Sequence, residues 1–130
     1  MEATTGLSSV DARETANLIG SDKVEGTAVY ASNGSKIGSI QRVMLDKVSG
    51  NVAYAVMSFG GLLGIGEDYY PLPWSILNYD TSLEGYRINL TKEQIERAPK
   101  YSASTGWNWN RENDQRVHDY YRTKPYWGGE

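Results

Sequence analysis

The chain has 130 residues, contains no cysteine and carries a net charge of −3, from 13 basic and 16 acidic residues. A single domain of this length buries a core without the help of metals or disulfides, and the absence of cysteine excludes disulfides, thiolate metal ligands and a cysteine nucleophile. Because basic residues are not in excess, the composition argues against nucleic acid as a partner.

Residues 1–21 are polar and predict an arm outside the main fold, in which Ser9 is a suitable N-cap for a short helix near Val10–Leu18. The N-terminus lacks the basic and apolar regions of a secretory signal peptide. No apolar run in the chain approaches the ~20 residues that span a bilayer. We therefore expect a cytoplasmic protein with no integral membrane segment.

Residues 22–98 carry the pattern of a β domain. Asn33-Gly34 and the turn Ser49–Asn51 favour the positive φ angles that join antiparallel strands. The apolar pattern around these turns predicts strands near three ranges: 24–31, 36–48 and 51–59. The second strand is long and its apolar phase slips, so Gly38 is a predicted position for a bulge or bend, as closing a small barrel requires.

The strand predicted over 51–59 is apolar on both faces. Its side chains form two alternating sets: Val52, Tyr54 and Val56 on one face, and Ala53, Ala55, Met57 and Phe59 on the other. A strand with one face in water should alternate apolar and polar residues. We therefore predict that its outer face is covered by the N-terminal arm, by the C-terminal tail or by a second chain, and the last possibility suggests a homodimer.

A glycine-rich loop, Gly60–Gly66, follows this strand. The dinucleotide-binding motif does not fit, because Tyr69 stands where its last glycine is needed, and the Gly-Lys-Ser/Thr of a P-loop is absent. The glycines more simply allow the chain to turn sharply. Three aliphatic side chains held in that turn form a predicted contact patch: Leu62, Leu63 and Ile65.

Two short strands are predicted within residues 68–80, with prolines at their edges, as expected at the open side of a barrel. A last strand follows over residues 84–90. A helix then begins after Thr91, which forms a capping-box pattern with Gln94, and ends before Pro99. These elements complete the predicted β domain.

Residues 99–130 form an aromatic-rich tail. The chain has 10 Tyr, 4 Trp and 1 Phe, and seven of these rings lie in the tail: Tyr101, Trp107, Trp109, Tyr120, Tyr121, Tyr126 and Trp127. A disordered tail is usually poor in aromatic residues, so we expect this one to dock on protein. A polar helix is predicted over Arg111–Thr123, with Asn110 as its cap. Stacking on single-stranded nucleic acid would need more basic residues among the rings.

His118 is the single histidine and the candidate for a metal ligand. It shares a predicted helix face with Asp114, and Glu112 lies close by, so the three could bind a divalent metal weakly. A solvated helix face with charge pairs explains the same residues more simply. Other acidic residues cluster at predicted turns, where loop solvation is the simpler interpretation: Glu67, Asp68, Asp80 and Glu84. The sequence therefore assigns no catalytic residue, no cofactor and no metal site.

Several short motifs follow one another over about residues 22–90. They are G-x-x-V-Y (Gly26–Tyr30), K-I-G-x-I (Lys36–Ile40), S-G-N-V-A-Y (Ser49–Tyr54), the loop F-G-G-x-x-G-I-G (Phe59–Gly66) and Y-P-L-P-W (Tyr70–Trp74). Together they resemble a PRC-barrel domain, the module shared by the photosynthetic reaction-centre H subunit and the C-terminal half of a ribosome-maturation factor. The chain lacks the membrane helix of the first and the RNA-related domain of the second, so neither role is carried over.

The resemblance implies a mainly β fold, namely a small, partly open, six-stranded antiparallel barrel, here with short helices in the arm and tail. It also implies a non-catalytic role in assembly. Our hypothesis is a protein-interaction module that forms a homodimer. Its candidate interaction surface comprises Leu62, Leu63, Ile65, Tyr69, Trp74, Trp107, Trp109 and Trp127. The alternatives are a barrel that binds a small ligand or metal, and an adaptor recruited peripherally to a membrane protein complex.

Overall fold

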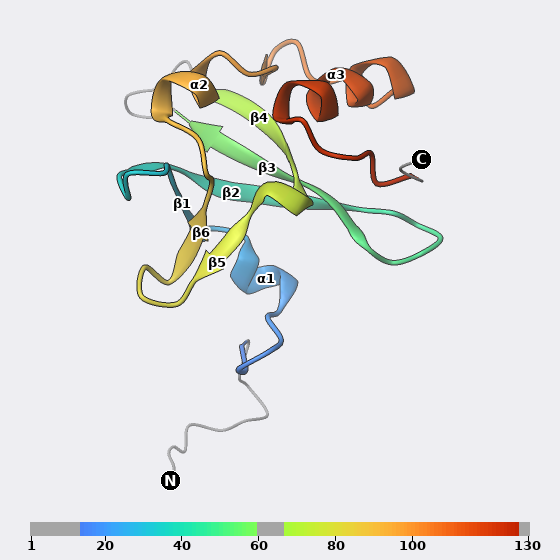
Figure 1. Ribbon diagram of the computed structural model, residues 1–130. Helices are drawn as coiled ribbons and strands as arrows, with labels where there is room; N and C mark the ends of the chain where they lie inside the picture. The colour runs from blue at the N-terminus through green and yellow to red at the C-terminus, as the bar shows by residue number, and fades with distance from the viewer. Residues whose placement is uncertain (1–13, 60–66, 128–130) are drawn as a thin grey trace, which may run out of the picture.

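The computed structural model describes residues 14–59 and 67–127, and its architecture is mainly β. Within these residues seven strands form one sheet, in the order β5-β6-β1-β2-β3-β4-β7, which bends round without closing (Figure 1). The strands are β1 (Ala28–Tyr30), β2 (Lys36–Leu45), β3 (Val52–Phe59), β4 (Asp68–Pro73), β5 (Asn78–Asp80), β6 (Gly85–Arg87) and β7 (Tyr101–Ser102). The helical segments are α1 (Ser21–Val24), the 3-10 turn η3 (Trp74–Ile76), α2 (Lys92–Glu96) and α3 (Arg111–Tyr121).

This sheet confirms the prediction of a mainly β, partly open barrel and differs from it in two details. The tail adds the short strand β7, which pairs with the start of β4 and brings the described sheet to seven strands. Strands β1 and β6 pair in parallel, whereas the other pairs in this sheet are antiparallel. Both differences depend on contacts between segments far apart in sequence, which local patterns do not reveal.

The predicted hairpin turns are present. Gly34 and Gly50 adopt φ angles of 88° and 79°, the left-handed region that favours glycine. Strand β2 ends at Leu45 rather than at residue 48, because the Asp46 carboxylate accepts hydrogen bonds from the backbone N–H groups of Val48 (2.8 Å) and Ser49 (3.1 Å). The side chain of Asp46 therefore forms the turn that ends the strand.

The irregularity predicted at Gly38 is also present. The β1–β2 register shifts between Val29 and Tyr30, opposite this glycine, and the β2–β3 register shifts again just after Ile40. A Cβ atom at Gly38 would lie 2.2 Å from the backbone oxygen of Ser58. Glycine is needed here because the two strands approach too closely for any side chain.

The core lies inside the curve of the sheet and is closed at one end by helix α2. Its most deeply buried apolar side chains include Val29, Ile40, Ala55, Met57, Leu72, Ile88 and Ile95. Helix α2 begins with the predicted capping box, in which the Thr91 hydroxyl accepts from the Gln94 backbone N–H and the Gln94 side chain accepts from the Thr91 N–H. The cap fixes where α2 starts and so places Ile95 over the core.

The prediction of a helix near Val10–Leu18 is wrong over Glu14–Leu18, the part that the structure describes. There the arm forms a loop closed by a β-bridge between Glu14 and Ile19. The Thr15 hydroxyl accepts hydrogen bonds from the backbone N–H groups of Asn17 (3.3 Å) and Leu18 (2.9 Å). A threonine that binds the backbone in this way favours a turn over a helix, and the helical turn comes later, at α1.

Candidate functional site

The outer face of β3 is covered by the C-terminal tail of the same chain. Helix α3 lies over β4 (Figure 1), and its His118 ring lies 5.3 Å from that of Tyr54 in β3. The helix is capped as predicted by Asn110, whose side chain accepts from the Asn113 N–H. At the centre of this contact is Tyr54, whose ring centroid lies 5.3 Å from Trp109 and 5.6 Å from Tyr126. Of the three covers that the sequence left open, the structure selects the tail. This face of β3 therefore gives no reason to infer a homodimer.

The tail rings form a continuous aromatic layer with rings of the sheet. Centroid separations are 5.5 Å for Tyr69–Tyr101, 5.9 Å for Tyr101–Trp107, 6.3 Å for Trp107–Trp109 and 5.3 Å for Trp109–Tyr54. Three residues of the predicted interaction surface, Tyr69, Trp107 and Trp109, are thus brought together, and each is half-buried. Edge-to-face and tilted pairs at these separations stabilise the layer beyond the burial of their area.

Trp127 adds to the other end of this layer. Its ring lies 5.3 Å from that of His118 and 5.1 Å from that of Tyr126, and the Arg111 guanidinium lies 4.1 Å from the Trp127 centroid. A cation over an indole face is a favourable contact. The residues after Trp127 lie outside the described part of the chain.

A polar centre lies beneath the layer, and it corrects the interpretation of His118 as part of a solvated helix face. His118 is 1 % exposed, and its Nδ1 lies 2.7 Å from the backbone oxygen of Asp114 and 3.4 Å from the hydroxyl of Tyr54. Among the residues that the structure describes, no group of three or more acidic, histidine or cysteine side chains could hold a metal ion. His118 is instead a buried side chain that packs against the rings of Tyr54 and Trp127.

Asp114 is the buried acid of this centre. Burial raises the pKa of its carboxyl, while the Trp107 indole N–H, His118 and Arg111 oppose the rise. The Trp107 Nε1 and Asp114 Oδ1 atoms are both buried without a partner at standard hydrogen-bond geometry. The indole N–H therefore acts on the carboxylate as a nearby dipole rather than as a well-formed hydrogen bond.

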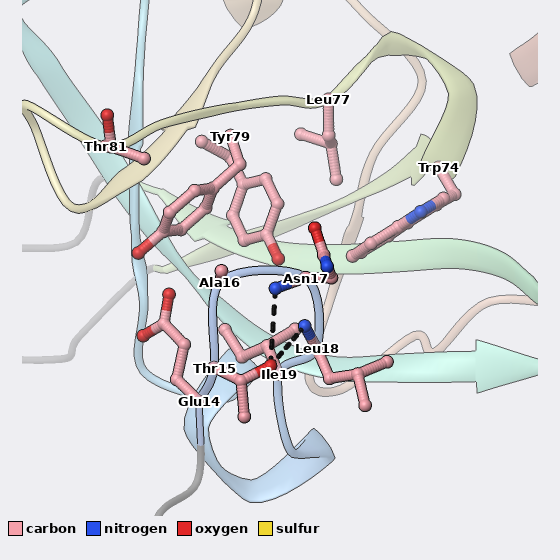
Figure 2. Close-up of a pocket in the computed structure, with 11 residues that line it drawn as sticks. Glu14, Thr15, Ala16, Asn17, Leu18, Ile19, Trp74, Leu77, Tyr79 and Thr81 are labelled. Carbon is pink, nitrogen blue, oxygen red and sulfur yellow. Dashed lines mark hydrogen bonds between the residues drawn. The ribbon is translucent and has the colours of Figure 1, made fainter.

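Trp74, a further residue of the predicted surface, lies elsewhere, in a cavity between the sheet and the arm. Figure 2 shows Trp74, Leu77 and Tyr79 on one side and the arm loop on the other. The cavity has a volume of about 400 Å³. It is lined by Glu14, Thr15, Ala16, Asn17, Leu18, Ile19, Trp74, Leu77, Tyr79, Thr81 and Tyr86. Sequence reasoning missed it because its two walls lie some 60 positions apart in the chain.

Three aromatic rings form a corner of this cavity. The Trp74 and Tyr86 centroids are 5.4 Å apart at an interplanar angle of 61°, and those of Tyr79 and Tyr86 are 5.1 Å apart at 71°. Burial raises the pKa of Tyr79 and Tyr86, and the carboxylate of Glu14 raises both further. Glu84 adds to the effect at Tyr79. The rings therefore stand in a locally negative field.

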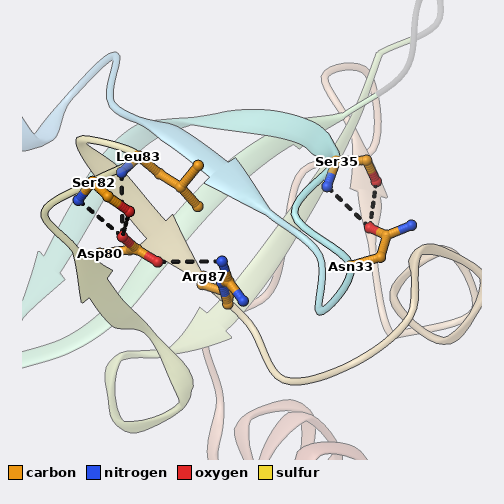
Figure 3. A network of polar contacts seen from close by, with 6 residues as sticks. All are labelled: Asn33, Ser35, Asp80, Ser82, Leu83 and Arg87. Carbon is orange, nitrogen blue, oxygen red and sulfur yellow. Dashed lines mark hydrogen bonds and ion pairs between the residues drawn. The ribbon is translucent and has the colours of Figure 1, made fainter.

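The wall that carries Tyr79 is held by a network of turn contacts, shown in Figure 3. The Asp80 carboxylate accepts from the Ser82 hydroxyl (2.6 Å) and from the Ser82 and Leu83 backbone N–H groups, and it pairs with Arg87 at 3.3 Å. The Ser82 hydroxyl is the main cause of the lowered pKa of Asp80. Asp80 thus closes the β5–β6 turn, as Asn33 does through Ser35 in the turn before β2.

The free end of the β2–β3 hairpin exposes apolar side chains that the sequence did not single out. Val48 is 97 % exposed, Leu45 57 % and Tyr126 44 %. Tyr126 is a residue of the tail, and its ring packs against that of Tyr54 in β3. We call Leu45 and Val48 the hairpin-end surface. In the sequence, the one feature that indicated this surface was a valine within a polar turn. The predicted patch of Leu62, Leu63 and Ile65 lies outside the described residues and stays a prediction.

Two comparisons with known proteins bear on these features. Residues 16–95, more than half of the chain, match the sequence profile of a family described as the PRC-barrel domain. An uncharacterized protein of Deinococcus radiodurans is 27 % identical over 93 residues, which make up 71 % of this chain and 33 % of that protein. The chain therefore spans about a third of the length of this relative. The family match includes most of the cavity but ends before the aromatic tail. In the described part of the chain, no helix has the length and apolarity to span a membrane.

Proposed function

The chain belongs to the PRC-barrel domain family, and we propose that it acts as a non-catalytic protein-interaction module that associates with a second copy of itself. The observation that carries this proposal is the hairpin-end surface. Large apolar side chains that are well exposed and grouped on a projecting element are typical of contact sites. Figure 1 shows the β2–β3 hairpin extending beyond the rest of the sheet, which makes its end accessible to another chain.

The energetics fit a modest contact. Full burial of Val48 and Leu45 contributes about 2 kcal/mol for each side chain, and a two-fold contact buries both on each copy. Association costs at least about 4 kcal/mol in lost rotation and translation. The balance of about 4 kcal/mol corresponds to a dissociation constant in the millimolar range or weaker. Asp46 and Lys47 lie side by side at the hairpin end, so a two-fold contact allows unlike charges to face each other.

The way the chain uses its titratable side chains supports a non-catalytic role. Asp46 and Asp80 close turns, and Asp114 and His118 lie inside the packing between the tail and β3. A catalytic acid or base must reach a substrate, usually within a cleft. The side chains of these four residues instead bind turn groups or lie buried.

Sedimentation velocity from micromolar to millimolar protein tests the proposal. We expect the wild-type mass to rise with concentration, and the double variant Leu45→Asp, Val48→Asp to remain monomeric over the same range. The control is Leu18→Asp, which places one such charge on a side chain that is 72 % exposed but lies on the arm. It should associate like the wild type. A wild-type mass independent of concentration, or equal loss of association in the control, would contradict the proposal.

A further inference from the structure

We propose that the cavity between the arm and the sheet binds a methylated ammonium group, of the kind found in choline or in a trimethylated lysine side chain. This inference is independent of the self-association proposed above, because the cavity and the hairpin-end surface share no residue. It rests on three observations: the arrangement of the rings, the sign of the local charge and the size of the space.

The three aromatic rings of the cavity are inclined to one another. Trp74, Tyr86 and Tyr79 succeed one another at angles of 61° and 71°, so they form a corner rather than a flat stack. Mutually inclined aromatic faces are the structure that recognises quaternary ammonium groups, because each face directs its negative quadrupole toward the cation. Trp gives the strongest such contact, and Trp74 stands opposite the arm in Figure 2.

The charge around the rings is negative on balance. Glu14 lines the cavity, and both Glu14 and Glu84 act on Tyr79. Arg87 at the same wall is paired with Asp80. The cation paired with Glu14 is Lys23, whose Nζ lies 3.8 Å from Glu14 Oε1, and both side chains are partly exposed. Lys23 does not line the cavity. An exposed ion pair of this kind is weak. A ligand cation bound against the rings can therefore also interact with the Glu14 carboxylate.

The size and the remaining walls fit a small cation with a short polar extension. A volume of about 400 Å³ lies within the range of small-molecule sites. Leu77 and Leu18 give apolar contact for methyl groups, and Asn17 and Thr81 offer polar groups at the wall. A methylated ammonium is favoured over a primary one because it loses less hydration when it enters an apolar space.

The first test is a titration of the intact chain with choline, followed by the indole N–H resonance of Trp74 in two-dimensional NMR. The neutral control is 3,3-dimethyl-1-butanol, which has the shape of choline without its charge. We expect saturable shifts at Trp74 with choline and binding at least about tenfold weaker for the neutral analogue. Equal binding of both, or shifts that do not saturate, would overturn the proposal. A parallel titration with a trimethyl-lysine peptide distinguishes a free ligand from a protein side chain.

Three variants at the cavity and one control variant test the site itself. Trp74→Leu should weaken choline binding about tenfold, whereas Trp127→Leu, in the aromatic layer, should not change it. Two surface variants keep the proposal testable if Trp74→Leu fails to fold. Glu14→Gln should weaken binding several-fold, because it removes a negative charge beside the rings. Lys23→Gln should strengthen binding, because it removes a positive charge there. Unchanged affinity in both surface variants would overturn the assignment.

Discussion

The aromatic layer at the tail and the aromatic cavity at the arm are built from the same residue types but differ in what covers them. In the layer, helix α3 buries Val117 and His118, which are 0 % and 1 % exposed, and His118 lies against Tyr54 of β3. In the cavity, a short loop stands over Trp74 and Tyr79 and leaves about 400 Å³ of space. A regular helix can pack side chains into a surface at close to crystal density, whereas a loop of small and polar residues cannot.

This difference indicates why aromatic content alone does not locate a binding site. Tyr54 contacts three rings of the tail and is 2 % exposed, whereas Tyr79 contacts Tyr86 and is 38 % exposed. The first ring contributes to stability and the second remains available to a ligand.

The largest effect is expected from removing the central ring of the layer. Tyr54→Ala should lower the free energy of unfolding by about 3–5 kcal/mol, because it leaves a large cavity beneath α3. Tyr79→Ala, its match in the arm region, should cost about 1 kcal/mol or less, since the ring is partly exposed. Urea denaturation followed by circular dichroism gives both values. Similar losses in the two variants would show that the layer and the cavity do not differ as described.

A pH-dependent effect is expected at Asp114. Its folded-state pKa is raised above the ordinary 3.8 by burial, so the folded chain holds this proton more tightly than the unfolded chain does. The contribution of Asp114 to stability therefore falls as the pH rises from about 3.8 to the raised pKa, and it is constant above that value.

The variant Asp114→Asn removes this titration without changing the shape of the side chain. We expect the variant and the wild type to be closest in stability at acid pH, with the variant gaining on the wild type as the pH rises. Melting temperatures measured across the acid range test this. A difference that stays flat with pH, or that grows in favour of the wild type, would show that the carboxylate is not desolvated in the folded state.

The smallest effect is expected in the arm loop. Thr15→Ala removes the hydroxyl that accepts from the Asn17 and Leu18 N–H groups, at a local cost of about 1 kcal/mol. Amide hydrogen exchange should quicken about fivefold at Leu18, with no change at Ile95 in the core. Equal acceleration at both amides would mean that the arm and the barrel open as one unit rather than separately.

Local signals in the sequence predicted the parts of the fold that depend on local chemistry. Gly34 and Gly50 adopt the expected positive φ angles, Thr91 and Gln94 form the capping box, and the outer face of β3 is covered as its two apolar faces required. The parallel pairing of β1 with β6 and the two-residue strand β7 were not predicted, because each depends on a distant segment and is too short to show a period.

The candidate sites were predicted less well for the same reason. The tail rings were recognised as packing on protein, but His118 was assigned to a solvated face because a polar helix sequence gives no sign of a buried partner. Trp74 was named as a contact residue without its cavity, since Glu14 and Tyr79 meet only in the folded chain. Val48 was overlooked because a single exposed apolar residue in a turn is common.

The central claim is that the tail covers β3 within one chain and that association uses the hairpin end instead. An isotope-filtered NOE experiment on a mixture of labelled and unlabelled protein tests it most directly, because it detects only contacts between chains. We expect interchain signals at the methyl groups of Val48 and Leu45, and none between Tyr54 and the rings of Trp109 or Tyr126. Interchain signals at Tyr54, with none at Val48, would show an exchanged tail and contradict the account.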